Sequence, residues 1–240
     1  MEEKRNDKAS MVRRLFDEIA EGYDRANSMM SLGRDRRWRL IVAERCALPK
    51  NGAALDICCG TGELSLALAG SDPSIKVTGL DFSAEMLALA RDKIGASGLA
   101  DRITLVEADA TRLPFTDASF DAATVGWGLR NVPDLDATLR EMARVTRPGG
   151  KVISIDMGHP RFPPVAWAYW SISRFFVPAV GRALAGNAPA YRYLHESAKA
   201  FIDQGELARR FAAVGLEGIR VKNFLGGAVA LVEGTKVRKA

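Results

Sequence analysis

The segment from residue 53 to residue 63, AALDICCGTGE, limits what this chain can fold into more than any other segment. It predicts a short apolar strand, a tight turn containing Gly60 and Gly62, and the start of a helix. Glycine permits a positive φ and lets a ligand approach the backbone, and the first N–H groups of a helix lack partners inside it. Carboxylates at Asp56 and Asp81 suit a nucleoside-bearing ligand. The turn alone also fits a degraded dinucleotide-binding fingerprint, since Gly-x-Gly is a weak signal.

Strands and helices are predicted to alternate after this turn. Helical spacing of apolar residues predicts helices over 84–94 and 134–146. Such alternation predicts an α/β fold with a parallel sheet, and ligands bind such a sheet at the carboxyl ends of its strands. Further buried strands are predicted at 76–80, 103–107, 122–125 and 151–156. The charged residues expected near these strand ends are Asp56, Asp81, Asp109, Arg130 and Asp156.

Length and composition favour one soluble, intracellular domain. The chain has 240 residues, 48% of them hydrophobic, and no window approaches the roughly 20 apolar residues of a transmembrane helix. Its first residues lack the apolar core of a signal peptide, so we expect a cytoplasmic protein. The three cysteines have no metal-ligand spacing, so no metal site is predicted, and Cys58 and Cys59 are interpreted as turn and core residues.

The net charge of +5 is modest. Its densest run is 34–39, RDRRWR, which on a helix would spread around more than one face. A plain solvated surface is the first interpretation, and contact with anionic lipid headgroups is the second. Nucleic acid is the least favoured partner, and we expect none.

The order of motifs resembles the class I S-adenosylmethionine-dependent methyltransferases. Within them, the chain resembles the ubiquinone/menaquinone biosynthesis C-methyltransferase family over nearly its whole length. This resemblance implies a doubly wound, mostly parallel, seven-stranded Rossmann-like sheet with a helical lid. The segments that carry it are 16–24 (FDEIAEGYD), 27–33, Trp38, 128–132 (GLRNV), 191–197 and 226–230.

We expect a single methyltransferase domain over 1–240. Residues 1–45 would form an N-terminal helical cap over the active site, and residues 46–157 the cofactor-binding core. Residues 158–205 would form a helical substrate-binding insertion. A terminal helix and an antiparallel hairpin over 206–240 would complete the sheet.

S-adenosylmethionine needs acceptors for its ribose hydroxyls and little bulk near the backbone. Asp81 is expected to accept from both ribose hydroxyls, although it could instead cap a helix. Asp109 is expected to accept from the adenine amino group while the Ala110 amide donates to the ring. Where many relatives have a serine, this chain has Gly126, so only backbone contact is expected there. The cofactor-binding prediction comprises Asp56, Gly60, Thr61, Gly62, Asp81, Phe82, Asp109, Ala110 and Gly126.

The resemblance implies methyl transfer to a ring carbon of a reduced polyprenyl quinone precursor. Demethylmenaquinol is the favoured substrate, and a ubiquinone-branch benzoquinol or O- or N-methylation of another small aromatic remain alternatives. Arg130 and Asn131 are predicted to lie at the reacting ring, with Arg130 lowering the pKa of the substrate hydroxyl. A loop salt bridge to Asp134 or Glu141 is the alternative role for Arg130. Tyr23 is predicted to close over the sulfonium, with ordinary packing as its alternative.

Aromatic residues concentrate in the insertion between 157 and 201. One interpretation is a lid that caps the core. The other is an apolar entrance for a polyprenyl tail, formed by residues such as Phe175 and Val180, with part of it at the inner face of the cytoplasmic membrane. An exposed apolar lid also makes a homodimer plausible. The predicted substrate-binding residues are Trp127, Asp156, Trp170, Tyr191, Tyr193 and His195.

Two other classes of protein stay in view. A nicotinamide-dependent oxidoreductase shares the glycine turn but needs a fuller glycine fingerprint and a set such as Tyr-x-x-x-Lys, which is missing from the sequence. A non-enzymatic lipid or RNA binder would not need the cofactor residues, which are largely intact. Both are less favoured than a small-molecule methyltransferase.

Overall fold

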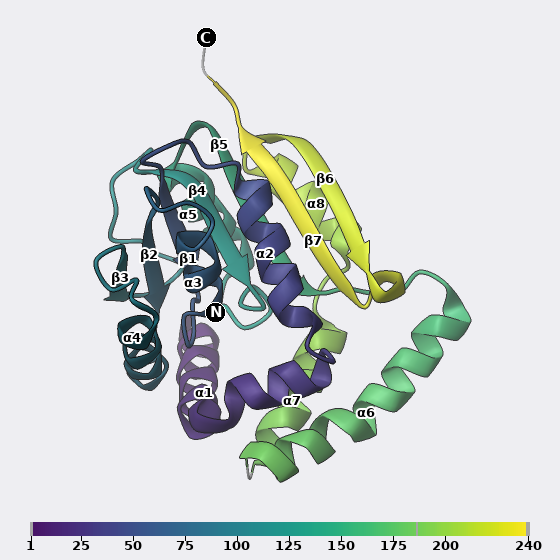
Figure 1. The fold of residues 1–240 in the computed structure, drawn as a ribbon. Coiled ribbons are helices and arrows are strands. Elements are labelled where there is room, and N and C mark those ends of the chain that lie inside the picture. The colour runs from purple at the N-terminus through teal and green to yellow at the C-terminus, as the bar shows by residue number, and fades with distance from the viewer. Residues whose placement is uncertain (1, 186, 239–240) are drawn as a thin grey trace.

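The computed structural model describes residues 2–185 and 187–238, which form a layered α/β domain (Figure 1). Its seven-stranded sheet has the order β3-β2-β1-β4-β5-β7-β6. Strands β1 to β5 pair in parallel, and β7 pairs antiparallel with both β5 and β6. The mostly parallel Rossmann-like sheet is therefore confirmed. The strands are β1 Ala53–Ile57, β2 Lys76–Asp81, β3 Ile103–Glu107, β4 Phe120–Gly126, β5 Thr146–Met157, β6 Leu216–Phe224 and β7 Val229–Lys236.

Helices cover both faces of the sheet. Helices α5 and α8 pack on one face, and α2, α3 and α4 pack on the other. Helices α1, α6 and α7 form a third layer across the carboxyl ends of the parallel strands (Figure 1). The helices are α1 Glu2–Met30, α2 Arg34–Cys46, α3 Glu63–Ala69, α4 Ala84–Ser97, α5 Leu135–Val145, α6 Pro163–Ala185, α7 Ala188–Ala200 and α8 Gln204–Ala213, with a 3-10 turn at Leu225–Gly227.

The core follows from the alternation of side chains along β1. Leu55 and Ile57 pack in the cluster that includes Met142 of α5 and Phe211 of α8, while Ala54 packs in the cluster beneath α2 and α3. Successive residues of a strand point to opposite faces, and both faces of this sheet are covered. The sequence of β1 is therefore almost continuously apolar, as expected for a parallel strand that is buried on both faces.

The segment 1–45 divides between two layers. Helix α1 lies across the sheet end, whereas Trp38 and Val42 of α2 are buried against the sheet face. The two helices meet at Gly33, whose φ of 71° allows the sharp change of direction. Helix α1 therefore lies over the strand ends, and only the N-terminal part of α2 reaches them.

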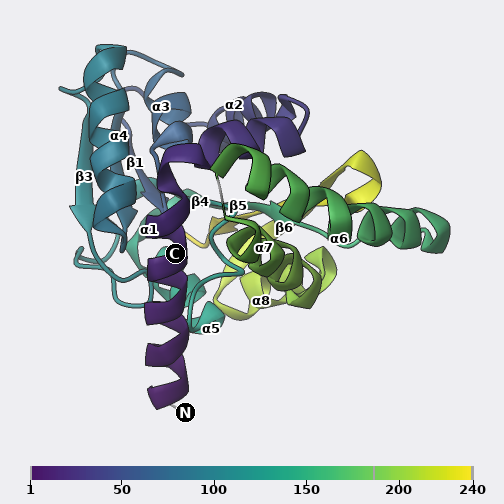
Figure 2. The same ribbon diagram turned by 90° about the horizontal axis from the view of Figure 1, so that it is seen from below.

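Helix α6 extends outward from the body of the molecule (Figure 2). Its inner side packs against α1 and α7, where Gly181 lies directly over the ring of Tyr191. Its outer side exposes Trp167 and Phe175, with 75% and 74% of their surface accessible. Among the described residues, no helix has an apolar stretch long enough to cross a bilayer.

Candidate active site

Two cavities lie where the parallel strands end, and Tyr23 and Trp127 line both of them. The first, of about 520 Å³, follows the ends of β1, β2 and β4. The second, of about 430 Å³, lies between α1, α2, α6 and α7. A ligand in the first cavity and a ligand in the second would therefore meet beside the same two aromatic rings.

Asp81 anchors the first cavity. Its Oδ2 accepts from the Gly60 amide at 2.8 Å, and its Oδ1 accepts from the Ser83 amide at 3.0 Å. Burial raises the pKa of this carboxyl, and those amides work against the rise. The N-cap of α4 is Ser83, whose hydroxyl accepts from the Met86 amide at 3.1 Å. Asp81 therefore spans the glycine turn and the second strand end instead of capping a helix.

Most predicted cofactor residues line this first cavity. Gly60 has a φ of 54°, and a Cβ added there would meet no atom within 4 Å, so the glycine keeps the wall open. Gly62 is different, because a Cβ added there would lie 3.2 Å from the Ala90 side chain of α4, so this glycine allows close packing of the turn against that helix. Arg13 and Phe16 of α1 also line the cavity and were not predicted. The predicted residues that line it are Gly60, Asp81, Phe82, Asp109, Ala110 and Gly126.

A smaller recess at the glycine turn shares Gly60 and Gly126 with the lining of the first cavity, and Asp24, Asp56 and Thr61 also lie in its wall. Asp56 is buried and accepts from the Ser65 hydroxyl at 2.7 Å. Burial raises the pKa of Asp56 to about 7, although that hydrogen bond opposes the change. The Thr61 hydroxyl donates to Asp24 of α1 at 2.7 Å, so α1 is tied to the turn.

The junction of the cavities is built on a buried ion pair. Arg130 Nη1 donates to Asp156 Oδ1 at 2.6 Å and to the Trp127 carbonyl at 2.6 Å. Only 6% of the Arg130 side chain and 3% of the Asp156 side chain are exposed. Burial disfavours the charged guanidinium, but Asp156 and Tyr23 outweigh it and raise the pKa of Arg130. The guanidinium therefore remains a fixed positive charge beside the two rings.

Asn131 belongs to the same loop and lines the first cavity. Its Oδ1 accepts from the Tyr193 hydroxyl of α7 at 3.5 Å, the limit of a hydrogen bond. Trp127 itself has a φ of 57°, unusual for a residue with a large side chain. Such a conformation persists only where its surroundings hold it, and here its amide donates to the Ile155 carbonyl at 2.7 Å.

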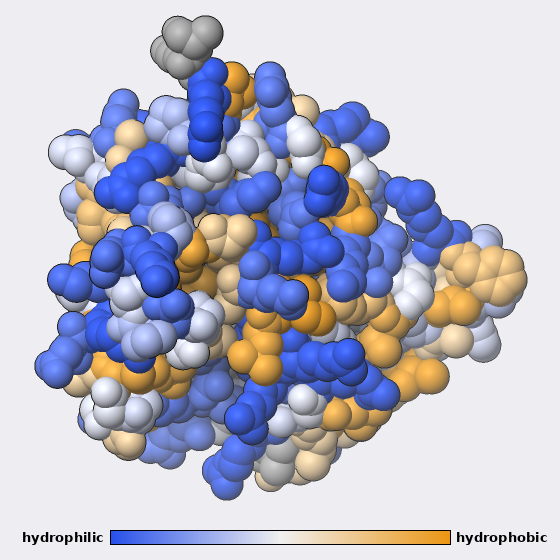
Figure 3. Space-filling model, turned by 45° about the horizontal axis from the view of Figure 1, so that its top comes forward, coloured by the Kyte–Doolittle hydropathy of each residue, from blue (hydrophilic) through white to orange (hydrophobic). Residues whose placement is uncertain are grey.

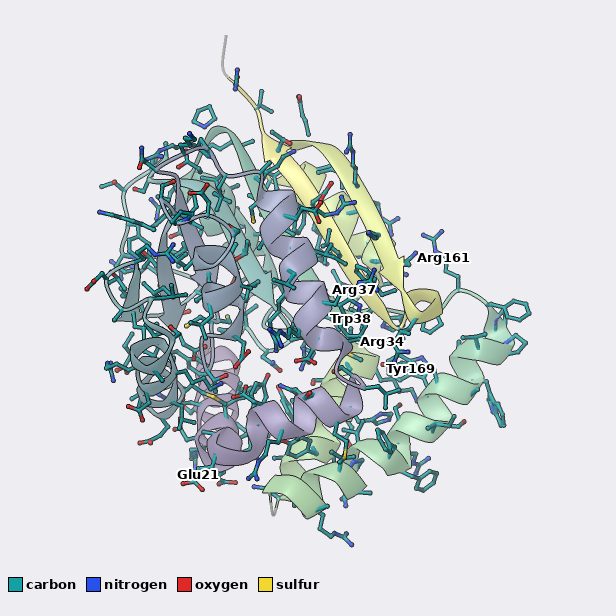
Figure 4. The ribbon with its side chains drawn as sticks, in the orientation of Figure 1. Glu21, Arg34, Arg37, Trp38, Arg161 and Tyr169 are labelled. Atoms are coloured by element: carbon teal, nitrogen blue, oxygen red, sulfur yellow. The ribbon has the colours of Figure 1, made fainter. Side chains whose placement is uncertain are left out.

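The second cavity is mainly apolar. Trp38 of α2 and Tyr169 of α6 face it from two sides (Figure 4). The predicted residues Trp127, Trp170 and His195 line it, and the His195 ring lies 3.1 Å from the Ser173 hydroxyl. Other apolar lining residues are Met30, Leu32, Met157, Ile172, Phe176, Val177, Leu194, Ala198, Leu225, Ala228 and Val229.

Three predicted substrate residues line neither cavity, and one of them, Tyr193, approaches the site only through Asn131. Tyr191 is completely buried between α1, α6 and α7 and lines neither cavity. Asp156 lines neither cavity, and its contact with the site is the hydrogen bond that it accepts from Arg130. Sequence reasoning missed Tyr169 and Arg39, both of which line the second cavity. Helical spacing places Arg39 on the same side of α2 as Asp35, but only the packing of Trp38 and Val42 on the sheet shows that this side is buried.

In the ranges 2–185 and 187–238, no cluster of three or more His, Cys, Asp and Glu side chains lies close enough to hold a metal ion.

The fold is that of the class I methyltransferases. A solved S-adenosylmethionine-dependent methyltransferase from Thermotoga maritima superposes with a TM-score of 0.67 at 20% identity, over 94% of this chain and 99% of that one. Phosphoethanolamine N-methyltransferase 2 of Haemonchus contortus, solved with S-adenosylmethionine, gives a TM-score of 0.62 at 18% identity, over 84% of this chain and 53% of that one.

Sequence comparison narrows the class to a family. A demethylmenaquinone methyltransferase of Desulfitobacterium hafniense is 46% identical over 97% of this chain and 92% of its own length. The model of the ubiE/COQ5 methyltransferase family matches residues 2–236. The chain belongs to the ubiE/COQ5 methyltransferase family, and its cofactor is S-adenosylmethionine.

The residues present fit this cofactor. Asp81 offers carboxylate oxygens to a ribose, the open side of Gly60 leaves room for a ligand against the backbone, and Asp56 can receive an ammonium group. When bound, the cofactor supplies a methyl group on a positively charged sulfur.

Proposed function

We propose that this chain transfers the methyl group of S-adenosylmethionine to a ring carbon of demethylmenaquinol. The substrate named for the Desulfitobacterium hafniense relative supports this proposal. The observation that carries it is the apolar second cavity, which meets the cofactor cavity at Tyr23 and Trp127. That cavity suits an aromatic ring bearing a hydrocarbon tail, because its lining is mostly apolar with few polar groups.

In the proposed reaction, the sulfur–methyl bond breaks as a bond forms between the methyl carbon and the ring carbon. The ring carbon becomes nucleophilic when a neighbouring hydroxyl loses its proton. The fixed positive charge of Arg130 stabilises the resulting oxyanion, and Asp156 keeps that guanidinium oriented. The ring carbon then loses its own proton while the oxygen takes one up, so the ring regains aromaticity and the hydroxyl is restored. The products are menaquinol, S-adenosylhomocysteine and one proton, which passes to solvent.

Tyr23 and Asn131 complete the proposed catalytic group. Tyr23 lines both cavities and lies edge-on to Phe16 of α1, with ring centroids 5.7 Å apart. An aromatic face beside a sulfonium provides a cation–π contact. Asn131 lines the cofactor cavity and not the second one, so in this proposal it contacts the substrate ring where that ring reaches the junction of the two cavities.

The polyprenyl tail would leave the second cavity along α6. Ile172 and Phe176 line that cavity and also belong to the exposed apolar face of the helix. Orange and tan atoms gather at the projecting end of the molecule, where α6 begins (Figure 3). We include in the proposal a transient contact of this face with the inner surface of the cytoplasmic membrane, where a long-tailed quinol resides. A homodimer that covers the same face is the competing arrangement.

The test compares reduced naphthoquinols and benzoquinols, each with a long or a short prenyl tail. The proposal predicts preferred methylation of the long-tailed naphthoquinol. Equal rates with a benzoquinol would contradict the menaquinone branch. For the tail path, Trp167→Gln/Phe175→Gln should weaken binding to anionic vesicles and leave S-adenosylhomocysteine affinity unchanged. Unchanged vesicle binding, or a dimer that the double variant dissociates, would overturn the membrane contact.

A further inference from the structure

Arg39 of α2 is a buried cation with unused donors. Its Nη1 donates to Asp35 Oδ2 at 2.5 Å, and its guanidinium lies 5.2 Å from the centre of the Trp127 ring. Only 9% of its side chain is exposed. A guanidinium carries five N–H donors. Among the described residues, Asp35 is its only hydrogen-bond acceptor, and the Nε and Nη2 groups have none.

Arg39 borders two of the cavities at the site. Arg39 lines the small recess above the glycine turn together with Asp24, Asp56 and Thr61. Burial raises the pKa of Asp56 and of Tyr23, and the positive charge of Arg39 opposes this rise at both groups. The guanidinium therefore lies near the inner end of the cofactor cavity.

The wall of the recess is acidic. Three acidic side chains, Asp24, Asp56 and Glu63, line it. The amino acid end of the cofactor brings an ammonium group and a further carboxylate. Asp56 suits the ammonium, but the ligand carboxylate needs a cation beside it. Lys93 already pairs with both Asp24 and Glu63.

We propose that Arg39 receives the α-carboxylate at the methionine end of the cofactor, through the Nε or Nη2 donors that Asp35 leaves unused. Asp35 holds the guanidinium in place, and the Ser31 hydroxyl fixes Asp35 in turn through a 2.7 Å hydrogen bond. The Trp127 ring fixes the other side of the guanidinium. Arg39 thereby sets the depth at which the methyl group is presented to the second cavity.

The test uses two ligands that differ only beyond the sulfur. S-adenosylhomocysteine carries the amino acid end, and 5′-methylthioadenosine lacks it. Calorimetry on Arg39→Gln should show about a tenfold or greater loss of affinity for S-adenosylhomocysteine, as expected for a charged hydrogen bond. Affinity for 5′-methylthioadenosine should stay unchanged. Arg39→Lys should recover part of the loss, because it keeps the charge but not the planar fork.

Two controls separate this role from a structural one. Arg37→Gln, on the exposed side of the same helix, should change neither affinity. Should Arg39→Gln fail to fold because Asp35 is left unpaired, the double variant Asp35→Asn/Arg39→Gln removes both charges and should show the same selective loss. Equal losses for both ligands would overturn the proposal. So would unchanged S-adenosylhomocysteine affinity with a raised KM for the quinol, which would place Arg39 on the substrate oxygen instead.

Discussion

Arg130 and Asp156 form an ion pair 2.6 Å long that is almost completely buried at the junction of the two cavities. Arg130 follows β4 and Asp156 lies near the end of β5, so neighbouring strands of the sheet hold the two partners. Removing one partner leaves an uncompensated buried charge, which costs about 3–5 kcal/mol. The pair therefore links the stability of the fold to the electrostatics of the site.

The first prediction concerns this pair. Asp156→Ala should lower the free energy of unfolding by about 3 kcal/mol and reduce turnover about a hundredfold, because Arg130 loses its partner and its orientation. The double variant Arg130→Met/Asp156→Leu should recover most of the stability, since no buried charge remains, while turnover stays lost. Denaturant titration and initial rates measure both effects. A double variant with wild-type turnover would exclude Arg130 from the reaction.

Asp81 gives the second prediction. Asp81→Ala should weaken S-adenosylmethionine binding by about 1.5–3 kcal/mol, the range for a hydrogen bond to a charged group. The variant also leaves the Gly60 amide without its acceptor, so Asp81→Asn serves as the control that keeps one carbonyl oxygen there. Calorimetry with S-adenosylmethionine and with adenosine should show similar losses for both ligands. A loss confined to S-adenosylmethionine would move Asp81 away from the ribose.

The raised pKa of Asp56 leads us to expect that the stability of the protein falls with pH while its affinity for the cofactor rises. Its pKa of about 7 in the folded protein lies above the ordinary aspartate pKa of 3.8, so between these values the folded state holds a proton that the unfolded chain has lost. The stability of the ligand-free protein should therefore fall as pH rises from about 4 to about 7. Affinity for S-adenosylmethionine should rise as pH passes about 7, because the ionised carboxylate receives the ammonium group.

Asp56→Asn is the matched variant, since its amide oxygen can still accept from Ser65. It should flatten both pH profiles and leave weak, pH-independent binding. A pH dependence of binding that survives in this variant would show that another group titrates.

Removing the hydroxyl of Tyr191 should have little effect on turnover or on stability. Its hydroxyl is buried and has no hydrogen-bond partner among the described residues, and its ring lies against Gly181. Tyr191→Phe should therefore leave turnover unchanged and keep or raise stability, by up to about 1 kcal/mol, because it removes an unpaired buried polar group. Gly181→Ala should destabilise, since a Cβ there would lie 2.2 Å from that ring. Loss of turnover in Tyr191→Phe at full stability would return Tyr191 to the substrate site.

Local patterns in the sequence were enough to predict the sheet and the cofactor end of the site. The conformations of the strand at 53–57 and of the glycine turn are determined by their own residues. Parallel pairing of the strands then brings Asp81 and Asp109 to the same edge of the sheet. The end of the helix predicted over 134–146 also agrees closely, because α5 ends at Val145 and β5 begins at once.

Tertiary packing decided what the sequence could not. The run 34–39 was interpreted as a mainly solvated charge cluster, and Arg34, Arg36 and Arg37 are indeed exposed. Arg39 is buried because its side of α2 also carries Trp38 and Val42, which pack on the sheet. Tyr191 was expected near the substrate because of the motif that contains it, yet α7 turns that side chain into the helical layer. Neither outcome depends on nearby sequence alone.

The most direct test of the central claim, methyl transfer to a ring carbon at the junction of the two cavities, is to follow an isotopically labelled methyl group from S-adenosylmethionine to reduced demethylmenaquinone. Mass spectrometry and NMR of the product locate the label. We predict a methyl group bonded to a ring carbon, formed together with one S-adenosylhomocysteine per turnover. A label found on a quinol oxygen, or no transfer to the quinol by protein that binds the cofactor, would contradict the account.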